Sequence, residues 1–129
     1  MSESFPVKNG VKQGGILSPI LFCVYLDSLL VKLCTCGKGC FIGNLCLAVT
    51  AYADDIVLLA PTASAMRHLL SVCDDFAAEY DILFNASKSK CIYFAPCNNF
   101  IRSGTKIPRP VFYIGSKAID YVKSWPHLG

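Results

Sequence analysis

The alternation of hydrophobic and polar positions predicts two helices of different character. Residues 20–32 are apolar almost all round, which is typical of a helix buried on most of its faces. Ser18 and Pro19 precede this run, and they are favoured at a helix N-cap and at the first helical position. Residues 64–80 instead carry one apolar stripe at helical spacing, which predicts an amphipathic helix. Its acidic residues lie off the stripe, on a face that we interpret as solvated: Asp74, Asp75 and Glu79.

Shorter apolar runs bounded by turn residues predict strands. Residues 40–42 and 45–52 are expected to flank a tight turn at Gly43-Asn44, and residues 56–59 to form the next strand. The later part of the chain is expected to hold a short strand at 91–94, an exposed loop at 96–110, and short strands around turns at 111–125.

Asp54 and Asp55 stand next to each other between the apolar runs 45–52 and 56–59. Alternating strand geometry would point the two carboxylates to opposite faces of a sheet. A tight turn between two strands instead lets both stand at a hairpin tip, where one hard cation can be shared. Asp is also common in turns for local hydrogen-bonding reasons. A metal site and an ordinary solvated turn are therefore equally supported by these two residues alone.

Further motifs, in a fixed order, favour the metal site. The segment 10–22 reads Gly-Val-Lys-Gln-Gly-Gly-Ile-Leu-Ser-Pro-Ile-Leu-Phe, and with Tyr-Ala-Asp-Asp at 52–55 it resembles the palm of reverse transcriptases. More narrowly, it resembles the enzymes of non-LTR (LINE-type) retrotransposons and of group II introns. Asn-Ala-Ser-Lys-Ser-Lys at 85–90 is similar to the family's Asn-x-x-Lys-Ser segment before a strand. Trp-Pro-His-Leu-Gly at 125–129 looks like the start of its Leu-Gly hairpin beside the primer.

This resemblance implies an α+β fold, in which the antiparallel sheet of a polymerase palm packs against two helices. It implies one partial reverse transcriptase domain over residues 1–129. The implied activity is RNA-directed DNA synthesis, in which a primer 3′-hydroxyl attacks the α-phosphate of a deoxynucleoside triphosphate and pyrophosphate leaves. Two Mg²⁺ ions, with Mn²⁺ as a substitute, serve such a reaction. The implied partners are an RNA template, a DNA primer, the dNTP and the remainder of the polymerase polypeptide.

The same resemblance assigns roles to individual residues. Asp54 is implied as the principal metal ligand and Asp55 as the neighbouring, less direct one. Lys88 is implied as the third catalytic residue, which meets and protonates the departing pyrophosphate, although a solvated loop lysine is its alternative interpretation. Tyr52 has an ordinary strand aromatic as its alternative. Nucleotide or template contacts are implied for Gln13, Gly14, Gly15, Tyr52 and Asn85, and primer contacts for Leu128 and Gly129.

The chain also departs from the family pattern. The family carries a further aspartate on a strand well before the Gln-Gly segment, whereas residues 1–9 contain no Asp and Glu3 lies too close to Gln13 for that role. The fingers would precede residue 1 and the thumb would follow Gly129. We therefore expect a palm fragment that is inactive in isolation. The alternative is a non-catalytic nucleic-acid-binding or interaction module that keeps the palm fold.

Composition and charge add weaker support. The chain is 53% hydrophobic and only 16% charged, below the roughly 25% charged residues of typical soluble domains, so some faces are expected to pack against partner segments. Five basic and eight acidic residues precede Ile82, whereas seven basic and one acidic residue lie from Ile82 onward. An acidic, cation-binding half joined to a basic half suits an enzyme that acts on a polyphosphate backbone, although scattered lysines also merely solvate loops.

The eight cysteines are interpreted as reduced thiols. Cys34, Cys36 and Cys40 lack paired Cys-x₂-Cys spacing and have no histidine nearby, so a zinc module is disfavoured. Cys23, Cys46 and Cys73 fall at apolar positions and are expected to be small buried hydrophobes. Because no signal region opens the chain and no run approaches the roughly 20 apolar residues of a membrane helix, an intracellular protein without a membrane partner is expected.

Overall fold

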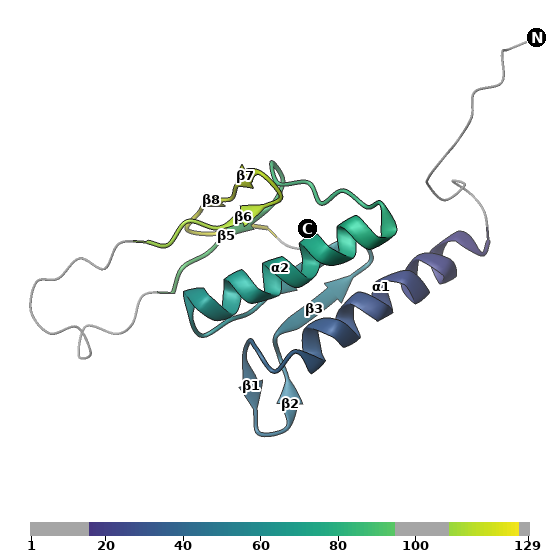
Figure 1. Cartoon of the computed structure of the whole chain (residues 1–129), viewed down its shortest axis with the longest axis horizontal. Coiled ribbons are helices and arrows are strands. Elements are labelled where there is room, and N and C mark those ends of the chain that lie inside the picture. Colours follow the sequence, from purple (N-terminus) through teal and green to yellow (C-terminus); the bar gives the residue numbers. More distant parts are fainter. Residues whose placement is uncertain (1–15, 95–108, 127–129) are drawn as a thin grey trace, which may run out of the picture. The chain divides into compact units, whose positions relative to one another are not determined.

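The computed structural model describes residues 16–94 and 109–126 (Figure 1). The chain divides into two compact units, Met1–Ile82 and Leu83–Gly129. The loop predicted at 96–110 lies almost entirely outside the described residues.

The first unit contains two helices and four short strands among its described residues. Its elements are α1 (Ser18–Thr35), β1 (Phe41–Ile42), β2 (Leu45–Cys46), β3 (Val49–Tyr52), β4 (Asp55–Leu58) and α2 (Ala63–Tyr80). The helix predicted at 64–80 is confirmed as α2. The Thr62 side chain accepts a hydrogen bond from the Ala65 N–H, 3.1 Å away, and so caps the start of α2. Asp81, with φ of 52°, ends it in the left-handed conformation.

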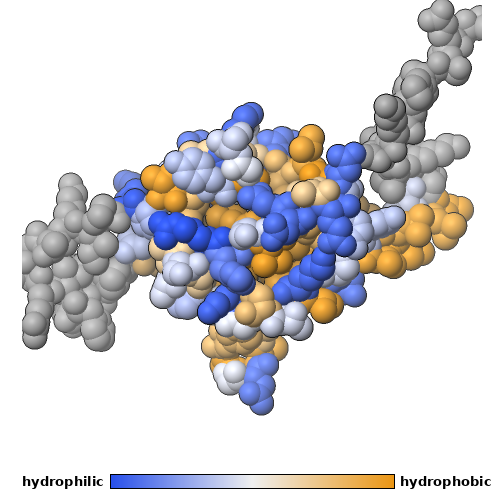
Figure 2. All heavy atoms as spheres, in the orientation of Figure 1, coloured by the Kyte–Doolittle hydropathy of each residue, from blue (hydrophilic) through white to orange (hydrophobic). Residues whose placement is uncertain are grey.

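Helix α1 begins one residue earlier than predicted and is less buried than predicted. Leu17, and not Ser18, occupies the N-cap position, where no side chain caps the helix. Leu29 and Leu33 have 0% of their surface exposed, but Ile20 is 59% and Val24 is 65% exposed. The expectation of burial on most faces is therefore wrong for this structure, because α1 packs on α2 and β3 along one side only. Figure 2 shows the resulting apolar surface over the N-terminal part of α1.

Length and hydropathy alone would let α1 cross a membrane, and it is the one such helix among the described residues. The apolar core helix of a soluble protein passes the same test. Asp27 and Lys32 interrupt its apolar character, and Leu29 and Leu33 pack inside the unit. By length and composition α1 therefore passes a test that no run of the chain was expected to pass, and Leu29 and Leu33 are its buried residues.

The core of the first unit lies between the two helices and the start of β3. Its most buried residues are Leu29, Leu33, Ala48, Leu69 and Phe76. At the exposed edge of the helix pair, Lys32 Nζ lies 2.6 Å from a Glu79 carboxylate oxygen. This hydrogen bond raises the pKa of Lys32 and lowers that of Glu79. Because both side chains are about half exposed, the pair adds little stability.

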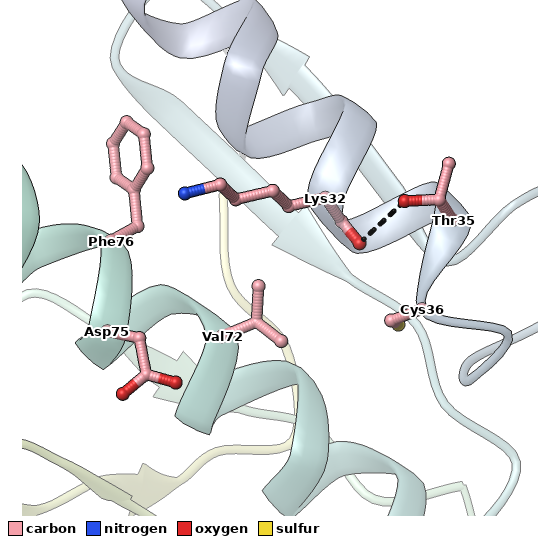
Figure 3. Close-up of a pocket in the computed structure, with 6 residues that line it drawn as sticks. All are labelled: Lys32, Thr35, Cys36, Val72, Asp75 and Phe76. Carbon is pink, nitrogen blue, oxygen red and sulfur yellow. Dashed lines mark hydrogen bonds between the residues drawn. The ribbon is translucent and has the colours of Figure 1, made fainter.

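A shallow cavity of about 340 Å³ lies beside this ion pair (Figure 3). The Lys32 ammonium extends across it towards Phe76 and lies 5.6 Å from the centre of that ring. Because the lysine is already held by Glu79 and the ring, the cavity reflects incomplete packing between the helices. Its lining residues are Lys32, Thr35, Cys36, Val72, Asp75 and Phe76.

The strands pair two by two. The pairs β1–β2 and β3–β4 are antiparallel, as predicted for an α+β fold, but they are separate two-stranded sheets. The strand predicted at 45–52 is broken at Leu47-Ala48, because the Leu47 N–H donates to the Cys40 carbonyl and the Ala48 carbonyl accepts from the Leu59 N–H. Leu47 therefore extends the β1–β2 pair and Ala48 extends the β3–β4 pair, so the chain changes its pairing partner between these two residues.

The second unit is built from four two-residue strands in its described part: β5 (Lys90–Cys91), β6 (Tyr113–Ile114), β7 (Lys117–Ala118) and β8 (Asp120–Tyr121). The pair β6–β7 is antiparallel, whereas the pair β5–β8 is parallel. The parallel pair departs from the prediction, which was an antiparallel sheet. The strand predicted at 91–94 begins one residue earlier and is shorter. Burial raises the pKa of Tyr121 to about 12, and its hydroxyl donates to the Pro110 carbonyl.

The cysteines predicted to be buried differ from one another. Cys73 is buried in the helix interface, and burial raises its pKa to about 12. Cys46 is half-buried. Cys23 is exposed, contrary to the prediction, because it lies on the open side of α1.

Candidate functional site

The acidic pair lies on the β3–β4 hairpin, but only Asp54 occupies the turn, whereas both residues were predicted there. Tyr52 pairs with Asp55, which leaves Ala53 and Asp54 as a two-residue turn and makes Asp55 the first residue of β4. Ala53 has φ of 51°, and Asp54 is not among the described residues with positive φ. A positive φ at the first turn residue alone is typical of a type II′ turn, whose twist matches that of the flanking strands.

The hairpin presents three polar side chains to solvent. Residues paired across antiparallel strands point to the same face, so Tyr52 and Asp55 share a face next to the turn residue Asp54. Asp54 and Asp55 are exposed, and Tyr52 is 64% exposed. All three side chains are therefore accessible to solvent at the tip of the hairpin.

The base of the same hairpin is buried and hydrogen-bonded. Ala48, directly before β3, has 0% of its surface exposed. Its carbonyl accepts the Leu59 N–H at 2.8 Å, and the Leu59 carbonyl accepts the Cys40 N–H at 3.1 Å. An exposed acidic tip on a held base fixes the carboxylates on a rigid element, as a metal site requires.

The chemistry of the tip suits a hard divalent cation. Mg²⁺ and Mn²⁺ prefer carboxylate oxygens, and Mg²⁺ is usually held by one or two carboxylates together with substrate phosphates. Within residues 16–94 and 109–126, no three metal-ligating side chains come together. Asp54 and Asp55 thus offer two carboxylates, and a complete metal site there would need further oxygens from a substrate or from other residues.

The second unit presents the predicted lysine on an ordered turn. Asn85 Oδ1 accepts the Ser87 and Lys88 N–H groups at 3.1 and 3.2 Å, so the predicted Asx-type hydrogen bond is present. Lys90 is engaged, with Nζ 2.7 Å from Asp120 and 5.8 Å from the centre of the Trp125 ring. Lys88 is exposed, which leaves it as the cation of this segment that faces solvent.

The structure brings together some of the predicted site residues. Tyr52, Asp54 and Asp55 share one hairpin, and Asn85 and Lys88 share one turn of the other unit. The hairpin belongs to the first unit and the turn to the second, so they form two separate groups of candidate residues. The remaining predicted site residues lie outside the described part of the chain: Gln13, Gly14, Gly15, Leu128 and Gly129.

Two residues that support the hairpin were not identified from the sequence alone. Ala53 could have been found, because a two-residue connection between strands requires a positive φ. Gly39 could not, because its role depends on a distant contact. A Cβ atom added at Gly39 would lie 2.4 Å from the Ala48 Cβ atom, so only glycine fits against the base of the hairpin.

Ala53→Gly is expected to stabilise the first unit by about 0.5–1 kcal/mol, because glycine adopts positive φ without the steric cost that alanine pays. The measurement is the denaturant midpoint of the 129-residue chain. Ala51→Gly in β3 is the matched control and should destabilise by a similar amount. A loss of stability in both variants would contradict the assigned turn.

Comparison with known proteins identifies relatives along nearly the whole chain. The family described as reverse transcriptase (RNA-dependent DNA polymerase) matches residues 1–122. A retrovirus-related Pol polyprotein from the type-2 retrotransposable element R2DM of Drosophila melanogaster is 36% identical over 131 residues, which cover 99% of this chain and 12% of the relative. A Pol polyprotein from the type-1 retrotransposable element R2 of Popillia japonica is 38% identical over 124 residues, covering 95% of this chain and 17% of the relative. No solved structure matches.

Proposed function

This chain belongs to the reverse transcriptase (RNA-dependent DNA polymerase) family, and on that premise we propose that it supplies the catalytic hairpin of an RNA-directed DNA polymerase from a non-LTR retrotransposon. The observation that carries the proposal is the β3–β4 hairpin, which presents Asp54 and Asp55 at an exposed tip on a buried base. Two carboxylates on a rigid turn are suited to nucleotidyl transfer.

Asp54 and Asp55 are proposed to hold divalent metal, Mg²⁺ or Mn²⁺, with Asp54 as the principal ligand. Bound divalent ions stabilise the charge that develops on the attacking and leaving oxygens of a phosphoryl transfer. The fit rests on the hard oxygen donors of the two side chains and on their exposure. Tyr52 shares a face with Asp55, and its ring is proposed to lie against the primer end.

Lys88 is proposed to neutralise, and to protonate, the departing pyrophosphate. Its backbone N–H is held by Asn85, so the lysine is presented from an ordered turn, and its ammonium is not taken up by Asp120 as that of Lys90 is. Gln13, Gly14 and Gly15 are proposed to contact the nucleotide or template, and Leu128 and Gly129 the primer.

The chain spans 12% and 17% of the length of the two relatives named above. Further metal ligands and the grip on template and triphosphate are therefore proposed to come from the remainder of a longer polypeptide. The proposed partners are an RNA template, a DNA primer and dNTPs, and the proposed place of action is intracellular.

The test uses a chimera, in which this chain replaces the matching segment of the Drosophila relative. Primer extension by the chimera is measured on an RNA template with Mg²⁺. The chimera is expected to extend the primer, whereas the 129-residue chain alone is expected to give no product, because two carboxylates leave a two-metal site incomplete.

A soluble chimera that binds template and primer but makes no product would favour the alternative function, a non-catalytic nucleic-acid-binding module. The unmodified relative, purified in parallel, controls for the assay. Robust extension by the isolated chain would contradict the proposal that other residues complete the site.

A further inference from the structure

The parallel pair β5–β8 aligns the one acidic residue of the second unit with a lysine next to the candidate turn. Lys90 of β5 is in register with Asp120 of β8, and Lys90 Nζ lies 2.7 Å from an Asp120 carboxylate oxygen. The Val122 N–H donates to the Cys91 carbonyl at 2.9 Å, which continues the same pairing. Because side chains alternate along a strand, this register places both charges on one face of the pair.

Lys90 is the less exposed partner of this ion pair. Its side chain is 15% exposed, whereas that of Asp120 is 75% exposed. The Lys90 ammonium also lies 5.8 Å from the centre of the Trp125 ring. In the Lys32–Glu79 pair of the first unit, by contrast, both side chains are about half exposed. A mostly buried ammonium depends more on its carboxylate than an exposed one does, so the pair in the second unit is the stronger one.

The turn directly before Lys90 is closed on itself. The Asn85 carbonyl accepts the Lys88 N–H at 3.1 Å and the Ser89 N–H at 3.0 Å. The Ser89 hydroxyl donates to the same carbonyl at 3.0 Å. Together with the bonds to Asn85 Oδ1, these contacts make residues 85–89 one hydrogen-bonded turn. Since Lys90 follows this turn without a spacer, a contact that holds Lys90 also holds the turn.

We propose that Asp120 is a positioning residue for Lys88 and acts through Lys90. The ion pair fixes the turn to β8, and so fixes the place at which the Lys88 ammonium meets pyrophosphate. It also neutralises Lys90, which leaves the exposed Lys88 as the cation that this segment offers to the leaving group. This role rests on the function proposed above for Lys88.

In the reaction step concerned, the primer oxygen forms a bond to the α-phosphorus, and the bond from the α-phosphorus to the bridging oxygen breaks. The Lys88 ammonium gives one proton to that bridging oxygen and becomes a neutral amine, while the primer hydroxyl loses its proton to solvent. A proton donor that is displaced from the leaving oxygen is less effective, and it matters most for a basic leaving group.

The first measurement uses the 129-residue chain and does not depend on catalysis. Asp120→Asn keeps the size of the side chain and removes its charge. Hydrogen exchange of the Lys88 and Ser89 amides is expected to become about tenfold faster, the effect of losing one hydrogen bond to a charged group. Unchanged exchange at these two amides would overturn the proposal.

Two further variants separate this effect from a general loss of folding. Lys90→Met removes the pair without leaving a buried charge, and should accelerate exchange to a similar extent. Asp120→Glu keeps a carboxylate and should restore part of the protection. The Leu69 amide, in α2 of the other unit, reports global unfolding and should exchange at the same rate in every variant. Equal acceleration at Leu69 would count against the proposal.

The second measurement uses the chimera and single-turnover incorporation of two dNTP analogues, which carry a β,γ-methylene or a β,γ-difluoromethylene group. The methylene leaving group is the more basic one. Asp120→Asn is therefore expected to lower incorporation of the methylene analogue about tenfold more than that of the difluoromethylene analogue, and Lys88→Met still more. Glu79→Gln breaks the exposed pair of the first unit and is the matched control, which should leave the ratio of the two rates unchanged.

The outcomes distinguish the role of Asp120 from that of Lys88. A ratio that changes in Lys88→Met but not in Asp120→Asn leaves the proton donor in place and overturns the positioning role. If neither variant changes the ratio, the function proposed for Lys88 is itself wrong. A ratio that changes equally in Glu79→Gln would show that it reports stability, and would also overturn the positioning role.

Discussion

Asp54→Asn, introduced into the chimeric polymerase, is expected to reduce primer extension about a thousandfold, the effect of removing one preorganised electrostatic contact from a transition state. Asparagine keeps the size of the side chain and removes its charge. Because Asp54 is exposed in a turn, the fold should tolerate the change. The measurement is single-turnover incorporation of one dNTP with saturating Mg²⁺.

Two further variants sharpen this result. Asp55→Asn should lower incorporation less than Asp54→Asn, because Asp55 is proposed as the less direct ligand. Asp75→Asn changes an exposed carboxylate on α2, away from the hairpin, and should leave incorporation unchanged. Equal losses in Asp54→Asn and Asp75→Asn would point to net charge, and not to a metal site, as the cause.

Metal binding can be separated from catalysis on the 129-residue chain alone. Millimolar Mg²⁺ should shift the amide resonances from Ala51 to Ile56 slightly, since two carboxylates without phosphate bind this ion weakly. Asp54→Asn should remove the shifts. If Asp54→Asn and Asp55→Asn both titrate like the unmodified chain, the hairpin is an ordinary solvated turn.

Gly39→Ala is expected to destabilise the first unit by about 2–4 kcal/mol, which combines overpacking with backbone strain. The new methyl group would lie 2.4 Å from the Ala48 Cβ atom and 3.1 Å from the Leu59 carbonyl oxygen. Neither neighbour can retreat, because Ala48 and Leu59 are hydrogen-bonded to each other at the base of the hairpin. Chemical denaturation of the 129-residue chain gives the change in stability.

Gly37→Ala is the matched control, because Gly37 also has positive φ but no atom within 4 Å of an added Cβ atom. It should cost only about 1 kcal/mol. In Gly39→Ala, adding Ala48→Gly removes the closest contact and should recover part of the loss. Equal destabilisation by Gly37→Ala and Gly39→Ala would show that strain, and not the contact with Ala48, decides the effect.

Local signals predicted the elements that depend on local structure. The apolar stripe of 64–80 gave α2 to within one residue. The acidic residues between two apolar runs gave the β3–β4 hairpin, although Asp55 begins β4 and does not lie in the turn. The burial of α1 was predicted wrongly. Apolar composition shows that burying a surface would be favourable, but it does not show whether the described residues pack against that surface. The break at Leu47-Ala48 was missed for a similar reason, since it depends on hydrogen bonds to Cys40 and Leu59.

In the candidate site, too, the sequence predicted what depends on local signals and not what depends on contacts between distant residues. Asp54 and Asp55 were found from the sequence because adjacent carboxylates between apolar runs are chemically conspicuous. The distinction between Lys88 and Lys90 needed the structure, because Asp120 and Trp125 hold Lys90 from about 30 positions away in the sequence. The fit of Gly39 against Ala48 is likewise visible only in three dimensions.

The two-residue turn between Tyr52 and Asp55 bears on how diverged members of this family should be interpreted. Side chains alternate along a strand, so one codon gained or lost inside the turn would either move Asp55 to the opposite face or force a bulge. Such an indel preserves the reading frame. A gained codon also leaves all four residues of Tyr-Ala-Asp-Asp recognisable nearby, whereas a lost codon removes one of them. The spacing of these codons, as much as their identity, therefore separates copies that keep the geometry of the hairpin from copies that have lost it.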